Sequence, residues 1–228
     1  MTKQVIRLKA EGKEMRDHPE LRVLRKVCVT GGIACGKSSL GEMLRKLGAG
    51  VIDADEVCHE LLRKSKPLID RIVSAFGAGI LNRNGGIDRR ILGRIVFNDD
   101  KKRKKLNALV HPKARRVINA WLKMQGARVS VAVAIVPLAY EAGWERGWDA
   151  VVCVAAPLST QIARLKRKGF SEKDARMRIA AQMPLAEKMN RADYVIFNAG
   201  TVASLRQQAM LVFRNVKEKT ERCYGRKK

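Results

Sequence analysis

A glycine-rich octapeptide near the start of the chain has the spacing of a phosphate-binding loop. Residues 31–38 read Gly-Gly-Ile-Ala-Cys-Gly-Lys-Ser, which satisfies G-x-x-x-x-G-K-[ST]. Glycines let backbone N–H groups turn inward around phosphate oxygens, and the amino end of the following helix adds its positive dipole. In such a loop Lys37 bridges the terminal phosphates and the Ser38 hydroxyl binds Mg²⁺. The motif therefore predicts a nucleoside triphosphate site, in which we interpret Cys35 as a tolerated small residue.

Two acidic residues, Asp53 and Asp55, stand where a predicted strand ends and a helix begins. One carboxylate can face the phosphates while the other caps the helix, or both can serve as helix caps. A carboxylate beside the γ-phosphate suits a kinase, because a base must accept the proton of the attacking hydroxyl. The predicted strand that ends in Pro137-Leu138 offers no acid. This disfavours a motor-type or GTPase-type ATPase, because those enzymes hold their metal through that carboxylate.

Basic side chains gather after the fourth predicted strand, at Arg164, Arg167, Lys168 and Arg178. Small kinases with a phosphate-binding loop place a mobile lid at this point of the chain. Guanidinium groups there can neutralise the charge that spreads over a transferred phosphoryl group. The alternative interpretation of this segment is a solvated basic helix.

Two histidines on predicted helices have open roles. His111 precedes Pro112, and it can bind a substrate phosphate or only satisfy a helix end. His59 follows Asp55 on the next helix and is equally ambiguous. The residue types alone do not decide between a binding role and a structural one for either side chain.

Alternating strands and helices must position these residues. Strands are predicted at 26–32, 50–53, 129–138, 148–157 and 192–198, and helices at 37–47, from 55 onward, through most of 67–125, over 159–191 and after 201. The runs 129–138 and 148–157 are nearly continuous apolar segments, which is typical of strands buried on both faces of a parallel sheet. The order predicts an α/β fold with a doubly wound parallel sheet and helical excursions.

Length and charge limit the organisation of the chain. Its 228 residues contain 47 Lys and Arg against 22 Asp and Glu, a net charge of +25, and 46% of them are hydrophobic. This fits one domain over 26–216, with a helical insertion at about 60–128 and a lid region at about 159–191. Residues 1–25 are predicted to form a peripheral extension, and residues 217–228 a basic tail.

Neither a membrane span nor a signal sequence is expected. The longest apolar run, 129–140, is interrupted by Ser130 and Pro137 and is shorter than the roughly 20 residues that a span requires. The first 26 residues lack the apolar stretch of a secretory signal. Five widely spaced cysteines without a CxxC pair fit reduced thiols rather than disulfides or zinc. We therefore expect a cytoplasmic protein.

Nine segments, in order along the chain, are similar to those of the dephospho-coenzyme A kinase family. They are VTGGIACGKS, VIDADEVCHELL, GGIDRRILGRIVF, LNALVHP, VPLAYEAG, DAVVCVAAP, QIARLKRKGFS, RIAAQM and ADYVIFNAG. The resemblance extends from about Lys26 to about Arg214. It implies a five-stranded parallel sheet of the P-loop nucleoside triphosphate hydrolase type, with separate acceptor-binding and lid subdomains. The implied reaction is the ATP-dependent phosphorylation of the ribose 3′-hydroxyl of dephospho-coenzyme A, with ATP and Mg²⁺ as cofactors.

The resemblance also implies roles for individual residues. Asp55 would be the general base and Asp53 would position or assist the metal, together with Ser38; Lys37 and Arg164 would join Asp55 in catalysis. The residues implied for ATP binding are Gly31, Gly32, Ile33, Ala34, Cys35, Gly36, Lys37, Ser38, Ser39, Arg167 and Asn198. Those implied for the acceptor are Asp53, Asp55, His59, His111, Pro137, Leu138 and Glu141.

The chain departs from the family pattern in three places. Ala34-Cys35 stands where Gly-Ser is common, and Ala139-Tyr140 where Leu-Phe is common. The lid run between Arg164 and Gly169 is one residue shorter than usual and has Lys168 where an Asp is common.

Two other functions compete with this interpretation. A different small-molecule kinase would share the loop and the lid but lack the VHP and VPLAYE segments. A nucleic-acid-binding protein would explain the net charge and the tail with Arg222, Arg226, Lys227 and Lys228. Three Tyr, five Phe and no recognisable RNA-binding motif disfavour nucleic acid. Both substrates of the kinase are polyanions, which a basic surface attracts. The oligomeric state stays open.

Overall fold

A parallel sheet forms the centre of the molecule. The computed structural model describes residues 24–97 and 99–224, so most of the predicted extension and the end of the basic tail lie outside the described residues. The strands are β1 (Arg25–Gly31), β2 (Gly50–Asp53), β3 (Val131–Ile135), β4 (Ala150–Ala155) and β5 (Tyr194–Phe197), in the order β2-β3-β1-β4-β5, all parallel. The predicted five-stranded parallel sheet is confirmed.

Strands β3 and β4 are shorter than the apolar runs 129–138 and 148–157 that predicted them. All residues of β3 and β4 are buried, as expected for strands covered on both faces. After Ile135 the backbone of Val136 still donates to Val29, but Pro137 has no N–H to continue the ladder. The strand therefore ends there, and the chain leaves the carboxyl edge of the sheet at Pro137.

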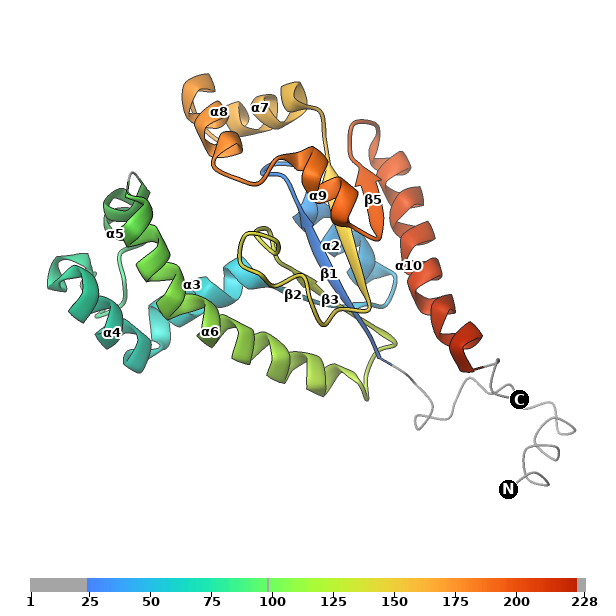
Figure 1. Cartoon of the computed structure of the whole chain (residues 1–228), viewed down its shortest axis with the longest axis horizontal. Helices are drawn as coiled ribbons and strands as arrows, with labels where there is room; N and C mark the ends of the chain where they lie inside the picture. The colour runs from blue at the N-terminus through green and yellow to red at the C-terminus, as the bar shows by residue number, and fades with distance from the viewer. Residues whose placement is uncertain (1–23, 98, 225–228) are drawn as a thin grey trace, which may run out of the picture.

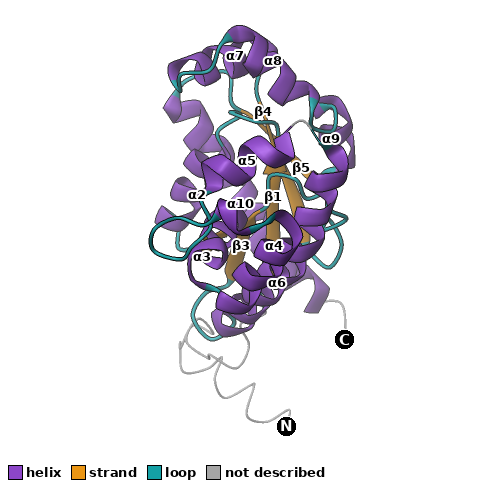
Figure 2. Cartoon of the chain, turned by 90° about the vertical axis from the view of Figure 1, so that its left-hand side faces the viewer, coloured by secondary structure: helices purple, strands orange, loops and turns teal. Residues whose placement is uncertain are grey.

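Helices cover both faces of the sheet (Figures 1 and 2). On one face α2 (Lys37–Lys46) and α10 (Val202–Tyr224) pack through residues such as Leu40, Leu44 and Val212 against Val29, Val133 and Val152. On the other face α6 (Asp100–Gln125) and the loop after β3 pack against Cys28, Ala132 and Ala134. These two cores hold the strand ends, and so the site, in fixed relative positions.

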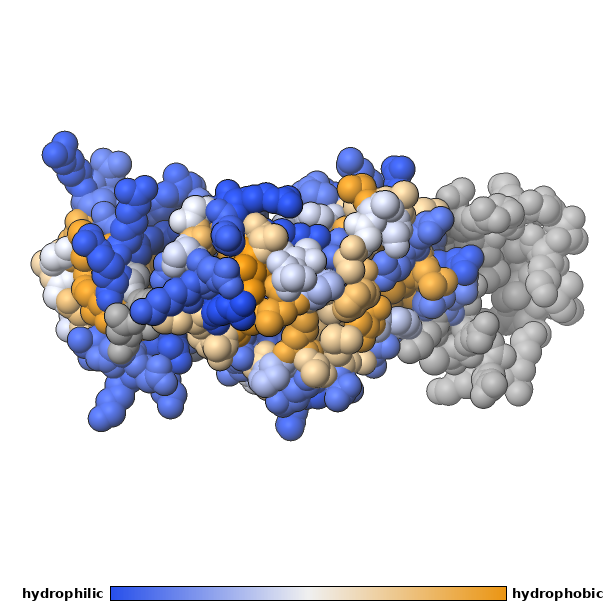
Figure 3. All heavy atoms as spheres, turned by 90° about the horizontal axis from the view of Figure 1, so that it is seen from above, coloured by the Kyte–Doolittle hydropathy of each residue, from blue (hydrophilic) through white to orange (hydrophobic). Residues whose placement is uncertain are grey.

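The helical insertion forms a lobe beside the sheet. It contains α3 (Ala54–Lys64), α4 (Lys66–Phe76), a short 3-10 helix at Ala78–Ile80, α5 (Arg89–Phe97) and the first half of α6. Leu68, Ile72, Ile80 and Leu92 are buried in a core separate from those of the sheet. Figure 1 shows the lobe at the left, and Figure 3 shows many hydrophilic side chains at this end of the molecule, with hydrophobic residues between them.

The basic segment predicted as one helical region forms three helices, α7 (Leu158–Arg167), α8 (Glu172–Ala180) and α9 (Leu185–Arg191). Gly169, with φ +87°, separates the first two, and Pro184 precedes the third. Ile162, Leu165 and Ala175 bury a small core against Ile33 and Ala34 of the glycine-rich loop. The first two helices therefore pack against the predicted phosphate-binding loop, and Figure 1 shows them beyond the end of the sheet.

Among the described residues, no helix combines the length and the apolar character that crossing a membrane requires.

Candidate active site

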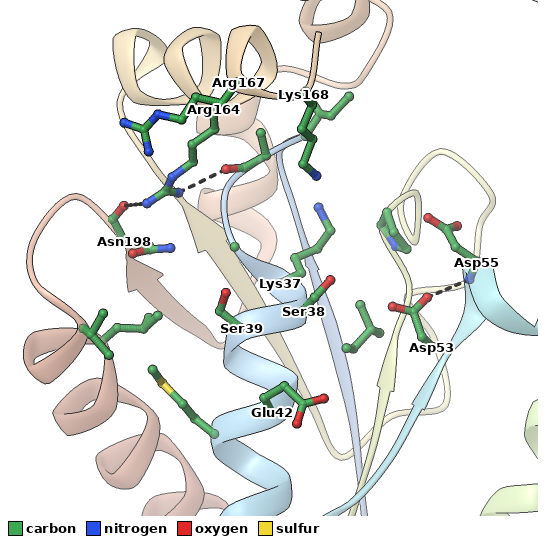
Figure 4. Close-up of a pocket in the computed structure, with 18 of the residues that line it drawn as sticks. Lys37, Ser38, Ser39, Glu42, Asp53, Asp55, Arg164, Arg167, Lys168 and Asn198 are labelled. Atoms are coloured by element: carbon green, nitrogen blue, oxygen red, sulfur yellow. Dashed lines mark hydrogen bonds between the residues drawn. The ribbon is translucent and has the colours of Figure 1, made fainter.

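A single cavity of about 960 Å³ opens at the carboxyl edge of the sheet. Its walls come from the glycine-rich loop, the β2–α3 junction, the end of β3, helix α7 and the turn after β5. The sequence-predicted residues that line it are Ile33, Ala34, Gly36, Lys37, Ser38, Ser39, Asp53, Asp55, Pro137, Leu138, Arg164, Arg167 and Asn198. In Figure 4, Lys37 and Ser38 lie between the two aspartates on one side and Arg164 with Asn198 on the other.

Glycine is required at two points of the loop for steric reasons. Gly31 has φ +134°, and a Cβ there would lie 2.1 Å from the carbonyl oxygen of Val154 on the neighbouring strand. Gly36 has φ +100° and precedes α2, and a Cβ on it would lie 2.2 Å from Nδ2 of Asn198. Ala34 takes a left-handed conformation, with φ +57°, between them. The loop thus turns tightly from β1 into α2, which aims the amino end of that helix at the cavity.

Lys37 bonds to the loop that it follows. Its Nζ donates to the carbonyl oxygens of Gly31 at 3.1 Å and Gly32 at 2.8 Å. Burial lowers the pKa of the Lys37 ammonium, and the nearby charge of Lys188 acts in the same direction, whereas Asp55 opposes it. The ammonium is therefore held over the loop, at the place where terminal phosphates of a nucleotide would lie.

Arg164 and Asn198 bind the apex of the loop. Arg164 donates through Nη1 to the Ala34 oxygen at 3.0 Å and through Nη2 to the Asn198 oxygen at 3.3 Å. Nδ2 of Asn198 donates to the Cys35 oxygen at 2.8 Å. These three bonds join α7, the end of β5 and the loop, and Figure 4 shows the two that Arg164 donates. The two side chains line the predicted nucleotide site and also fix the shape of the loop.

Asp53 and Asp55 occupy different positions at the start of α3. Oδ1 of Asp53 accepts from the Asp55 N–H at 2.8 Å, so Asp53 is the N-cap. Asp55 lies in the first turn and reaches solvent, yet the surrounding protein atoms raise the pKa of its carboxyl, and the charge of Asp53 raises it further. The positive charges of Lys37, His59 and Arg89 oppose that rise. Of the two arrangements open from the sequence, the structure has one cap and one carboxylate in the first turn, and both line the cavity.

The donor set of the cavity fits magnesium. The Ser38 hydroxyl and the carboxylates of Asp53 and Asp55 line it together. The described residues contain no group of three or more His, Cys, Asp or Glu side chains that would enclose an ion by themselves. Magnesium in phosphoryl-transfer sites is usually held by one or two carboxylates, phosphate oxygens and water. Ser38 and Asp53 therefore remain suitable magnesium ligands in the presence of a nucleotide.

The residues predicted for the acceptor divide between two hollows. Pro137 and Leu138 line the main cavity, whereas His111 and Glu141 line a second hollow of about 450 Å³ together with Lys104 and Arg115. His59 is half-buried on α3 and lines neither hollow, although its charge reaches Asp55. Arg89, at the start of α5, is a further residue whose charge acts on Asp55, and the sequence did not single it out. Its position in the GGIDRRILGRIVF segment, which resembles the family, could have indicated a role near the site.

The surroundings of His111 favour the neutral form of its imidazole over the charged form. Burial lowers the pKa of its imidazole, and the guanidinium of Arg115 lowers it further. Arg115 itself donates to the Gly143 oxygen at 2.6 Å and lies 5.2 Å from the ring centre of Trp144. The second hollow therefore contains an imidazole whose pKa is lowered, beside the positive charges of Arg115 and Lys104.

Cys35 is a buried thiol. Its side chain lies inside the loop with no exposure, and burial raises its pKa. A protonated, inaccessible thiol is a poor redox centre. This supports the interpretation of Cys35 as a tolerated small residue. Cys28, Cys35, Cys58 and Cys153 are all free, and the side chain of Cys223 lies outside the described residues.

Comparisons with known proteins agree on one family. The family model described as dephospho-CoA kinase matches residues 25–204. A dephospho-CoA kinase of Geobacillus kaustophilus is 46% identical over 188 residues, which cover 82% of this chain and 94% of the relative. One from Symbiobacterium thermophilum is 44% identical over 195 residues, covering 84% of this chain and 81% of the relative.

Two solved structures superpose on most of the chain. A dephospho-CoA kinase from Campylobacter jejuni superposes with a TM-score of 0.65 at 30% identity, covering 86% of this chain and 99% of that one. A Thermus thermophilus protein superposes with a TM-score of 0.73 at 32% identity, covering 85% and 98%. Because the family model matches residues 25–204, which are most of the chain, the chain belongs to the dephospho-CoA kinase family.

Proposed function

We propose that the chain transfers the γ-phosphoryl group of ATP to the ribose 3′-hydroxyl of dephospho-coenzyme A, giving coenzyme A and ADP, in keeping with its family. One observation carries the assignment of residues. A phosphate-binding loop, a carboxylate with a raised pKa and the Pro137-Leu138 wall line a single cavity. A nucleotide and an acceptor hydroxyl can meet in that cavity.

Asp55 is proposed as the general base. The attacking 3′-hydroxyl gives its proton to the Asp55 carboxylate as its oxygen bonds to the γ-phosphorus. The bond from that phosphorus to the β,γ-bridging oxygen breaks, and ADP leaves. A carboxylate whose pKa is raised is a better proton acceptor than an ordinary one.

Cations around the cavity are proposed to stabilise the transferred charge. Lys37 exchanges its bonds to the loop carbonyls for the terminal phosphates of ATP. Arg164, Arg167 and Lys168 line the same cavity from α7 and the turn after it. Ser38 and Asp53 would hold Mg²⁺, which supplies positive charge against the phosphate oxygens. The side of the cavity near Asn198, Gly200 and Val202 is left for the base and ribose of ATP.

The lobe of α3 to α6 is proposed to bind the acceptor. Its second hollow holds Lys104 and Arg115, which suit a diphosphate, and the neutral imidazole of His111 can donate or accept one hydrogen bond. The hollow adjoins the main cavity through the loop from Pro137 to Glu141. An acceptor can therefore extend from Asp55 toward α6.

Mass spectrometry tests the reaction directly. The purified protein is incubated with Mg²⁺, ATP and dephospho-coenzyme A, with adenosine and nucleoside monophosphates as competing acceptors. We expect coenzyme A and ADP in equal amounts and no phosphorylation of the competitors. Binding of ATP with no phosphorylated acceptor would reject the proposed reaction.

A further inference from the structure

A fully buried lysine, Lys188, lines neither of the two hollows, although its charge reaches Lys37. Its side chain has no exposure, although it belongs to a helix rich in charged residues. Nζ forms an ion pair with Oε1 of Glu141 at 2.7 Å and donates to the Pro137 oxygen at 3.2 Å. Removing an ammonium from water is costly unless its partners compensate. Here both partners belong to the loop that follows β3.

The acceptor wall, defined as residues 137–145, is held by α9 at further points. Oε1 of Glu141 also accepts from the backbone N–H of Met183 at 3.0 Å. Arg191, one turn after Lys188, lies 4.4 Å from the ring centre of Tyr140 and forms an ion pair with Glu145 at 3.0 Å. The wall is thus attached to the segment 183–191 along most of its length.

The same segment begins at the glycine-rich loop. The Ile33 N–H donates to Oε1 of Gln182 at 3.1 Å, just before the attachment at Met183. On the opposite side, the buried Thr30 hydroxyl at the end of β1 donates to the Pro137 oxygen at 3.1 Å. Pro137 therefore accepts from both Thr30 and Lys188. One short segment after the lid thus connects the phosphate loop with the wall that faces the acceptor.

We infer that Lys188 is a positioning residue for the acceptor: through Glu141 and the Pro137 carbonyl it fixes the acceptor wall relative to the phosphate-binding loop. The inference rests on the proposed function, because only that function makes residues 137–145 a wall that faces an acceptor. Lys188 lines neither hollow, so its effect on the acceptor passes through Pro137, Leu138 and Glu141. Its charge also lowers the pKa of Lys37, and Glu141→Gln, which keeps that charge, separates the two effects. A displacement of about 1 Å between reacting groups can cost on the order of 100-fold in rate.

A positioning role predicts that loss of the Lys188 contacts impairs use of the acceptor but leaves ATP binding unchanged, whereas a purely structural role does not. The bonds that shape the phosphate site, from Lys37, Arg164 and Asn198 to the loop, do not involve Lys188. Loosening the wall should therefore impair use of the acceptor and spare ATP binding. General destabilisation would impair both.

The experiment compares Lys188→Met, which keeps the length of the side chain and removes its charge, with Glu141→Gln, which keeps the shape of the partner. Lys173→Met on the exposed face of α8 is the matched control. For Lys188→Met we expect kcat/KM for dephospho-coenzyme A to fall about 10- to 100-fold, with the ATP Kd within threefold of wild type. Glu141→Gln should lower kcat/KM for dephospho-coenzyme A several-fold, and Lys173→Met should leave it unchanged.

Amide hydrogen exchange gives a second readout that needs no activity. In Lys188→Met the peptides covering 137–145 should exchange faster, while those covering 31–39 keep the wild-type rate. If the wild-type protein phosphorylates no acceptor, the proposed function fails, and this exchange pattern still tests whether Lys188 fixes the wall. Faster exchange in both regions, an equal loss of ATP affinity, or unchanged acceptor kinetics would overturn the inference. If Lys188→Met does not fold, Glu141→Gln is judged by the same criteria.

Discussion

The side-chain oxygen Oδ1 of Asp53 accepts the backbone N–H of Asp55 at 2.8 Å, at the junction where β2 becomes α3. This bond fixes Asp53 as the helix cap and leaves the Asp55 carboxylate in the first helical turn, facing Lys37 across the cavity (Figure 4). Two residues of the same type thus differ in environment. Their close spacing places the negative charge of Asp53 where it raises the pKa of Asp55.

Replacing the proposed base isolates the chemical step. Asp55→Asn keeps the size of the side chain and removes its ability to accept a proton. We expect kcat to fall by about 1,000-fold or more, because both base catalysis and the local negative charge are lost. ATP affinity, measured by calorimetry with a non-hydrolysable analogue, should stay within a few-fold of wild type. Wild-type turnover in this variant would remove Asp55 as the base.

Two substitutions of Asp53 separate its capping role from its proposed metal role. Asp53→Asn keeps a good N-cap, whereas Asp53→Ala removes the hydrogen bond to Asp55 and should lower the free energy of unfolding by about 1 kcal/mol. Urea denaturation measures this difference. Both variants should need more Mg²⁺ for half-maximal activity, because both lose the carboxylate. A magnesium dependence like that of wild type would exclude Asp53 as a ligand.

Gly31 and Gly93 give opposite predictions for the same substitution. In Gly31→Ala the new Cβ would meet the Val154 backbone, in a conformation that side chains rarely adopt. We expect a loss of about 3 kcal/mol or more, because a neighbouring strand cannot yield as a side chain can. Gly93, inside α5, has open space around it, so Gly93→Ala should stabilise the protein by about 0.5–1 kcal/mol. Thermal denaturation of both variants tests the pair, and equal effects would contradict the argument.

Elements with a strong local signal were predictable from the sequence. The glycine spacing of 31–38 specifies a backbone conformation, so the loop between β1 and α2 follows from residue types alone. The apolar runs that form β3 and β4 are too continuous for any position other than the middle of a covered sheet. The helix at 89–97 also follows from its apolar spacing. In each of these segments, local pattern and tertiary environment agree.

Features that depend on tertiary contacts were not predictable. Lys188 belongs to the basic segment 159–191, which the sequence left open as a lid or a solvated helix. Its burial depends on the approach of Glu141 and Pro137, which lie about 50 residues earlier in the chain. The resemblance implies a catalytic role for Arg164, but nothing in the sequence predicts that its side chain also bonds to Ala34 and Asn198, which lie on elements far apart in the sequence. Periodicity carries no information about which charged side chain finds a partner across the fold.

Removing the loop lysine tests the phosphate site. Lys37→Ala deletes the ammonium that bonds to the Gly31 and Gly32 carbonyls. Without that charge over the terminal phosphates, kcat should fall about 100-fold or more and ATP binding should weaken. Steady-state kinetics with calorimetry measures both quantities. Lys173→Ala on α8 is the exposed control, and an unchanged rate in Lys37→Ala would count against the proposed mechanism.

The pKa of His111 tests the electrostatics of the second hollow. Burial and the charge of Arg115 both disfavour the imidazolium, so its pKa should lie below the usual 6.5. Arg115→Met removes the repulsion and should raise that pKa, while Arg115→Lys keeps the charge and should leave it low. NMR titration of the three histidines, with His111→Gln for assignment, measures the shift. An unchanged pKa in Arg115→Met would show that burial alone sets the value.

The lowered pKa of His111 also makes stability depend on pH. The unfolded chain protonates this imidazole more readily than the folded protein does, so the free energy of unfolding should fall as the pH drops below the unfolded pKa of about 6.5. In Arg115→Met this loss of stability in acid should be smaller.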